Sequence, residues 1–150
     1  MGIARCLQEA REWVSRGDWQ ENAGKTLYRG MQETPQGEPA VGPSARTIGA
    51  RPHVDIPVDP SGSVYPGTGG MSVAPDTPSN LPRHRRPPEH GGTGKDPLWS
   101  IQERNLGVHL RYVADTVLVP THGVIEATIP TPFAAYQQAL AETAPYWARQ

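Results

Sequence analysis

Two polar residues stand in otherwise apolar, strand-like stretches, and their side chains are of the kind that bind anions and hydroxyl groups. Arg29 interrupts the run TLYRGM, residues 26–31. Arginine is rarely buried without a partner, so it either points to solvent or clamps an anion with its planar fork. Ser72 follows the run GTGG, residues 67–70. Glycine lets another group approach the main chain, so this run is either a tight turn or room for a ligand that Ser72 contacts.

Further chemically capable residues lie in a basic loop and in a late strand-like segment. The run RHRR, residues 83–86, is the strongest local positive patch, and it is either a solvated loop or an anion site to which Arg85 contributes. His122 and Glu126 stand four residues apart in HGVIEATI, and on a regular strand this even spacing places both on one face. With one cysteine and no strong ligand spacing, the chain does not favour a zinc site.

The composition predicts a single domain over residues 1–150 with long, proline-braced loops. Hydrophobic residues make up 36% of the chain, beside 16 glycines and 17 prolines. A net charge of −1 gives no global attraction to nucleic acid or to an anionic membrane. No apolar run reaches the length of a membrane span, no signal-peptide core is present, and Cys6 has no intrachain partner. We therefore expect a cytoplasmic location, or secretion without a cleaved signal peptide.

The hydrophobic periodicity predicts helices at both ends and strands between them. Residues 1–17 follow a helical stripe, and a second helix is expected from residue 131, with Pro145 kinking or ending it. Long loops are expected at 32–52 and 76–97. Strands are expected at 25–31, 53–60, 70–75, 98–101, 108–115 and 122–129. This order indicates an α+β fold.

The runs TLYRG with Arg29, GTGGMSV with Ser72 and THGVIEATIPT with His122 occur in an order that resembles the ADP-ribosyltransferase-like toxins delivered by bacterial type VI secretion, of the small Pseudomonas effector type. The resemblance implies a pair of small sheets facing an NAD-binding cleft, with N- and C-terminal helices. It also implies interbacterial toxicity inside a target cell and a cognate immunity protein in the producing cell. NAD would be the substrate, and its ADP-ribose would pass to an unknown macromolecular target or to water.

Carried over residue by residue, the resemblance places Arg29 on the phosphates of NAD and His122 in the wall of the cleft. Ser72 would orient the nicotinamide ribose, beside unhindered backbone at Gly70. Met71 departs from the family pattern, which has threonine there. Glu126 has no counterpart in that pattern, so its role rests on chemistry: a carboxylate can stabilise the oxocarbenium ion that forms when the nicotinamide–ribose bond breaks.

Two other classes of function remain open on the sequence. A metal-independent ribonuclease toxin could use His84, His122 and Glu126 as acid–base groups, although the balanced net charge argues against nucleic acid as a ligand. A non-catalytic, proline-rich interaction module could instead dock a partner through its terminal helices. Neither transfer nor hydrolysis of ADP-ribose is favoured over the other.

Overall fold

The computed structural model describes residues 24–115 and 121–150, and the predicted helix at 1–17 lies outside them. The described residues have an α+β arrangement, mainly an antiparallel sheet with one α-helix near the C-terminus. The strands are β1 (Thr26–Gly30), β2 (Ser63–Val64), β3 (Met71–Pro75), β4 (Leu98–Gln102), β5 (Leu110–Ala114), β6 (Gly123–Ala127), β7 (Thr131–Pro132) and β8 (Ala148–Arg149), and the helix is α2 (Phe133–Ala141).

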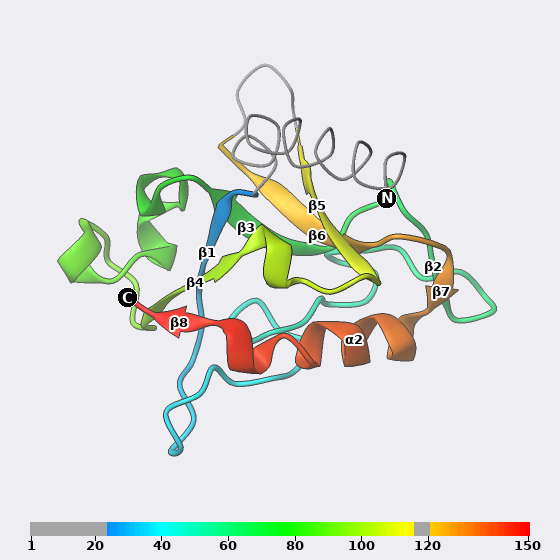
Figure 1. Ribbon diagram of the computed structural model, residues 1–150, viewed down its shortest axis with the longest axis horizontal. Helices are drawn as coiled ribbons and strands as arrows, with labels where there is room; N and C mark the ends of the chain where they lie inside the picture. Colours follow the sequence, from blue (N-terminus) through cyan, green and yellow to red (C-terminus); the bar gives the residue numbers. More distant parts are fainter. Residues whose placement is uncertain (1–23, 116–120) are drawn as a thin grey trace, which may run out of the picture.

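Six strands form one sheet in the order β5-β6-β3-β1-β4-β8, and β2 pairs separately with β7 (Figure 1). The predicted strands at 25–31, 70–75, 98–101, 108–115 and 122–129 are confirmed as β1, β3, β4, β5 and β6. The predicted strand at 53–60 was wrong. That segment begins with a turn, because Asp55 folds back to accept hydrogen bonds from the main chain and side chain of Arg51.

The two halves of the sheet meet at a short joint between β1 and β3. These strands pair only at Leu27 with Pro75 and at Tyr28 with Ala74. The next residue of β1, Arg29, sends its guanidinium to the carbonyl of Ser72 at 2.6 Å. A side chain therefore occupies the place where a continued ladder would put backbone hydrogen bonds. The sheet opens at this point.

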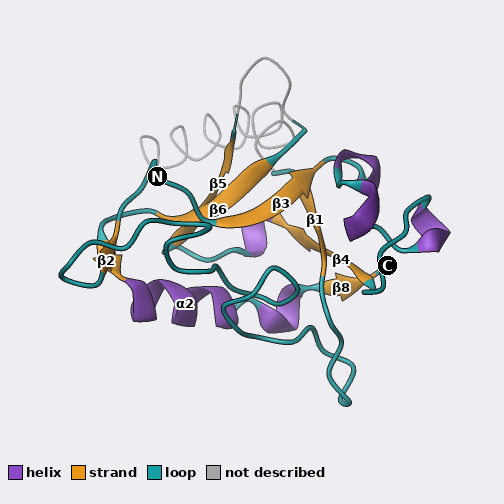
Figure 2. Ribbon diagram, turned by 180° about the vertical axis from the view of Figure 1, so that it is seen from behind, coloured by secondary structure: helices purple, strands orange, loops and turns teal. Residues whose placement is uncertain are grey.

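The main core lies between the sheet and α2, which runs along one side of it (Figure 2). Tyr136 and Leu140 of α2 are fully buried against the inward-facing residues of β3 and β6, among them Met71 and Ile125. The Tyr136 hydroxyl donates to the Ile125 carbonyl at 2.6 Å and accepts from the Met71 N–H at 3.0 Å. A phenol whose polar end is satisfied can be buried at little cost. This contact fixes α2 against the two central strands.

The segments predicted as long loops, 32–52 and 76–97, contain no strand of the sheet, and both reach the open joint. The second loop carries three short 3-10 turns at Pro78–Asn80, Arg83–Arg85 and Pro88–His90. Arg86 holds this loop together, because its guanidinium donates to the carbonyls of Leu81 and His90. One arginine of the RHRR run is thus structural, which leaves its neighbours to be assigned.

Candidate functional site

A pocket of about 160 Å³ opens at the joint between β1 and β3. It brings together residues that are far apart in the sequence: Arg29 from β1, Ser72 from β3, Arg85 from the basic loop and His122 from the start of β6. These are four of the six residues predicted to form a site. The other lining residues are Gly30, Ala45, Arg51, Asp55, Val73, Leu81 and Pro82. The lining therefore combines charged and apolar residues.

Arg29 is buried, with 5% of its surface exposed, and it donates chiefly to backbone carbonyls. Its Nε and Nη2 both reach the Thr47 carbonyl, at 3.1 and 2.9 Å. Nη2 also contacts the carbonyls of Ser44 and Gly49. Nη1 bonds Ser72 and has a second N–H that no described residue accepts. Arg29 therefore orders the 44–49 loop and keeps one donor for the pocket.

No carboxylate in the described part of the chain forms an ion pair with Arg29. Burial lowers its pKa to about 10, and nearby Asp55 partly opposes that shift. The guanidinium is therefore still positively charged at neutral pH. A buried charge without an opposite charge in contact is costly, and an anion bound in the pocket would relieve that cost.

Positive charge predominates among the pocket residues. Arg29, Arg51 and Arg85 face a single carboxylate, Asp55, which is paired to Arg51 at 2.9 Å. With the described residues, the Arg85 side chain makes one weak hydrogen bond, from Nη1 to the Ala45 carbonyl at 3.5 Å. Most of its donors are therefore available. The pocket has the charge and the hydrogen-bond donors to hold a phosphate group or a diphosphate.

Ser72 and His122 supply a hydroxyl and an imidazole to the lining of the pocket. No described residue hydrogen-bonds to the Ser72 hydroxyl, although the residue is only partly exposed. The His122 imidazole bonds through Nδ1 to the carboxylate of Asp115, and the two main chains are joined by a hydrogen bond of 3.0 Å. The carboxylate fixes the ring orientation and leaves Nε2 for other partners.

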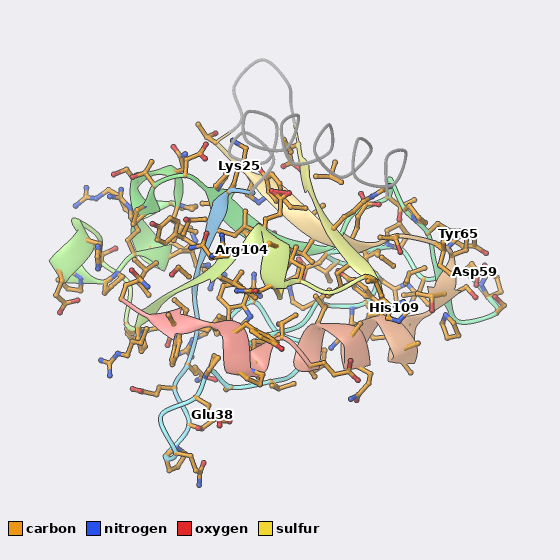
Figure 3. The ribbon with its side chains drawn as sticks, in the orientation of Figure 1. Lys25, Glu38, Asp59, Tyr65, Arg104 and His109 are labelled. Atoms are coloured by element: carbon orange, nitrogen blue, oxygen red, sulfur yellow. The ribbon has the colours of Figure 1, made fainter. Side chains whose placement is uncertain are left out.

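Glu126 does not line this pocket, although it lies on β6, the strand that begins directly after His122. Its side chain is only 2% exposed, and Oε2 accepts from the Gly67 N–H at 2.8 Å and from Arg111 at 3.4 Å. Gly67 belongs to a loop that a hydrogen bond from Tyr65 to Asp59 also fastens (Figure 3). The predicted catalytic carboxylate therefore anchors a loop. The even spacing of His122 and Glu126 predicts that their side chains lie on one face of the sheet, but it does not predict which of them reaches the pocket.

Gly69 and Gly70 make room for protein backbone, and neither lines the pocket. Their φ angles are +141° and +158°. A Cβ on Gly69 would overlap the Asp55 carbonyl, and one on Gly70 would overlap the Ile125 carbonyl. The Gly70 N–H donates to the Asp55 carbonyl at 3.0 Å. Gly70 was predicted to let a ligand approach, but the groups that approach this glycine pair are backbone carbonyls, of Asp55 in the 51–56 turn and of Ile125 in β6.

The sequence interpretation missed Arg51 and Asp55. Arg51 lies just before the segment 53–60, and Asp55 lies within it. The strand-like alternation of that segment concealed the turn that joins them. The signal that could have revealed it is the spacing of four between an arginine and an aspartate, which a compact turn brings into contact. His84, proposed as a ribonuclease acid–base group, is exposed and lies outside the pocket. The three groups of that hypothesis are not assembled in one site.

A second, more open hollow of about 420 Å³ lies between residues 104–109 and the C-terminal end of α2. Its lining includes Arg104 and His109, which come from the connection between β4 and β5 (Figure 3). It contains no residue that the sequence predicted to be functional. The pocket at the joint is therefore the better candidate site.

Comparisons with known proteins leave the site to be interpreted from its own geometry. No protein-family model, curated protein or solved structure matches the chain. In the part of the chain that the structure describes, no helix combines the length and the apolar character needed to cross a bilayer.

Proposed function

We propose that the pocket binds NAD and that the protein is a toxin that breaks the nicotinamide–ribose bond, passing ADP-ribose to a target or to water. The observation that carries this proposal is the meeting of Arg29, Ser72, Arg85 and His122 in one pocket. The sequence placed these residues together only through its resemblance to ADP-ribosyltransferase-like toxins and through the basic patch at 83–86. Their convergence at the joint of the sheet supports that resemblance.

The charge of the pocket suits the diphosphate of NAD. A diphosphate diester carries two negative charges, and three arginines against one aspartate leave an excess of two positive charges. Arg85 has donors to spare, and Arg29 keeps one N–H at Nη1. Charge-assisted hydrogen bonds of this kind bind phosphate more strongly than neutral donors do. We assign the diphosphate to the side of the pocket formed by these two arginines.

The remaining walls suit a ring and a ribose. Val73, Leu81 and Pro82 form an apolar surface of the kind on which a planar heterocycle packs. Ser72 and His122 supply a hydroxyl and an imidazole for ribose hydroxyl groups. Under this proposal, the two halves of the six-stranded sheet on either side of the joint would take the place of the two small sheets of the toxin fold.

The proposal extends to a partner. An enzyme that consumes NAD would kill the cell that makes it, so we propose a small immunity protein that covers the pocket. A standard interface of about 1,600 Å² in total would be large enough. Expression of the chain alone should arrest bacterial growth, and unhindered growth would remove the reason to expect such a partner.

The test is to incubate the purified protein with NAD and to measure both binding and free nicotinamide. Arg85→Gln should weaken NAD binding by about tenfold or more, because it removes a charged donor from a partly desolvated site. Arg83→Gln is the matched control, since Arg83 is an exposed residue of the same loop and does not line the pocket. Adding cell lysate distinguishes transfer from hydrolysis, because only transfer leaves ADP-ribose on protein. Absence of both binding and nicotinamide release would refute the proposal.

A further inference from the structure

We infer that Asp55 is the carboxylate that stabilises the positive charge formed when the nicotinamide–ribose bond breaks. This inference rests on the proposed function, and it assigns to Asp55 the role that was predicted for Glu126. Among the described residues that line the pocket, Asp55 is the only one with a carboxylate. Glu126 is held at the other end of β6 by Gly67 and Arg111.

The turn that carries Asp55 is fixed from several directions. The main-chain N–H groups of Val54 and Asp55 donate to the Arg51 carbonyl, at 3.2 and 2.9 Å. Ile56, the next residue, is buried in the core with 1% of its surface exposed. Gly70 donates its N–H to the Asp55 carbonyl at 3.0 Å, and a Cβ on the neighbouring Gly69 would overlap that carbonyl. The carboxylate is thus held in place before any ligand binds, as electrostatic catalysis requires.

The Asp55 side chain is 12% exposed, so its charge is only partly screened by water. Its Oδ2 accepts from the Arg51 N–H at 2.7 Å and from Nε at 3.1 Å, and Oδ1 accepts from Nη2 at 2.9 Å. Burial acts to raise the pKa of this carboxyl, but the hydrogen bonds and charge of Arg51 outweigh burial and lower it. Among the described residues, Oδ1 accepts only from Arg51, and a carboxylate oxygen can accept from a second group. Asp55 is therefore ionised at neutral pH.

The reaction creates a positive charge that such a group can stabilise. When the bond between C1′ of the ribose and N1 of nicotinamide breaks, its electron pair goes to the nitrogen and neutralises the pyridinium ring. The positive charge moves to C1′ and the ring oxygen of the ribose. Water then adds to C1′ and loses a proton, giving nicotinamide, ADP-ribose and one proton. Asp55 forms no bond in these steps, and its negative charge lowers the energy of the cationic state.

The experiment compares wild type with Asp55→Asn, in NAD binding by calorimetry and in nicotinamide release at saturating NAD. Asparagine keeps the shape and the acceptor oxygen but removes the charge. We expect kcat to fall about 100-fold, the size of effect seen when one electrostatic stabiliser is removed, while the Kd for NAD changes by less than about threefold. Asp96→Asn is the matched control, because Asp96 makes a two-bond pair with Arg46 at 2.7 Å and lies outside the pocket. It should leave kcat unchanged.

Each alternative outcome gives a decision. A weaker Kd with unchanged kcat would show that Asp55 only binds ribose hydroxyl groups and would overturn the inference, as would full activity of Asp55→Asn. If Asp55→Asn unfolds at a lower temperature than Asp96→Asn, nicotinamide release by Asp55→Ala is measured with added formate. Restored release would support the inference, and no restoration would overturn it. Formate restores a missing carboxylate charge but does not repair a turn. Absence of NAD binding in wild type would refute the proposed function instead, and the assignment of Asp55 with it.

Discussion

The two ends of β6 use polar residues in opposite ways. At its start, His122 lines a pocket and is bonded to Asp115, a residue that is itself exposed. Near its end, Glu126 is almost fully buried and bonded to Gly67 and Arg111. At the first end, Nε2 of His122 remains available to a candidate ligand. At the second end, the hydrogen bonds of Glu126 hold parts of the fold together. Position along a strand, rather than residue type, separates a candidate site residue from a structural one.

Arg29 and Arg85 show the same division within the pocket. Arg29 bonds four backbone carbonyls, which a buried guanidinium can satisfy together because its donors are planar and fixed. Arg85 makes one weak hydrogen bond within the part of the chain that the structure describes, and it lines the pocket. We conclude that Arg29 builds the pocket and that Arg85 is the better test of anion binding.

The largest effect is expected from Gly70→Ala. The new Cβ would overlap the Ile125 carbonyl, and the φ of +158° is unfavourable for alanine. We expect a loss of about 3 kcal/mol or more in unfolding free energy, measured by urea denaturation. Gly67→Ala is the control, since nothing lies within 4 Å of its Cβ and only its φ of +82° opposes alanine. That variant should lose about 1 kcal/mol. Equal losses would mean that Gly70 is not packed against β6.

Arg29→Lys should come next. Lysine keeps the charge but cannot reach the Thr47, Ser44 and Gly49 carbonyls together, so buried acceptors are left unpaired. We expect a loss of about 2–3 kcal/mol in stability together with most NAD binding. Arg85→Lys, measured in the same way, should leave stability within about 0.5 kcal/mol of wild type. Unchanged stability in Arg29→Lys would place this arginine with the ligand-binding residues and not with the framework.

Ser72→Ala probes the ligand side alone. No described residue bonds to the Ser72 hydroxyl, so its removal should change the melting temperature very little. Loss of one hydrogen bond to a bound ribose should lower nicotinamide release by about tenfold. If Ser72→Ala is fully active, the ribose does not lie beside β3.

Much of the framework could be predicted from the sequence, because apolar residues recur in short, strand-like patterns in the segments that became β1, β3, β4, β5 and β6, although β4 is buried on both faces. The 53–60 segment alternates too, yet its local hydrogen bonds between Arg51 and Asp55 form a turn instead. The spacing of apolar residues indicates which side chains are buried, but it does not indicate whether a segment pairs with another strand. It therefore could not reveal which carboxylate reaches the pocket, since Asp55 arrives there through a tertiary contact with Gly70.

Glu126→Gln tests the structural end of β6 directly. Glutamine can still accept the Gly67 N–H, and it loses only the charged contact with Arg111, whose side chain is 52% exposed. We expect a loss of about 1 kcal/mol or less in stability and unchanged nicotinamide release. A large fall in kcat at full stability would return the catalytic role to Glu126 and contradict the comparison with which we began.

The smallest effect is a pH dependence carried by Asp55. Its folded-state pKa lies below the usual value for an aspartate, because Arg51 outweighs the opposing effect of burial. As pH falls, the unfolded chain takes up the proton first, so the stabilisation is complete above about pH 5 and is lost as pH falls through the folded pKa. Asparagine does not titrate, and the other carboxylates are common to both proteins. The difference in unfolding free energy between wild type and Asp55→Asn should therefore shrink between pH 5 and pH 3, measured by urea denaturation. A difference that stays constant over this range would show that Arg51 does not hold Asp55 ionised, and the pocket would lose its prepared negative charge.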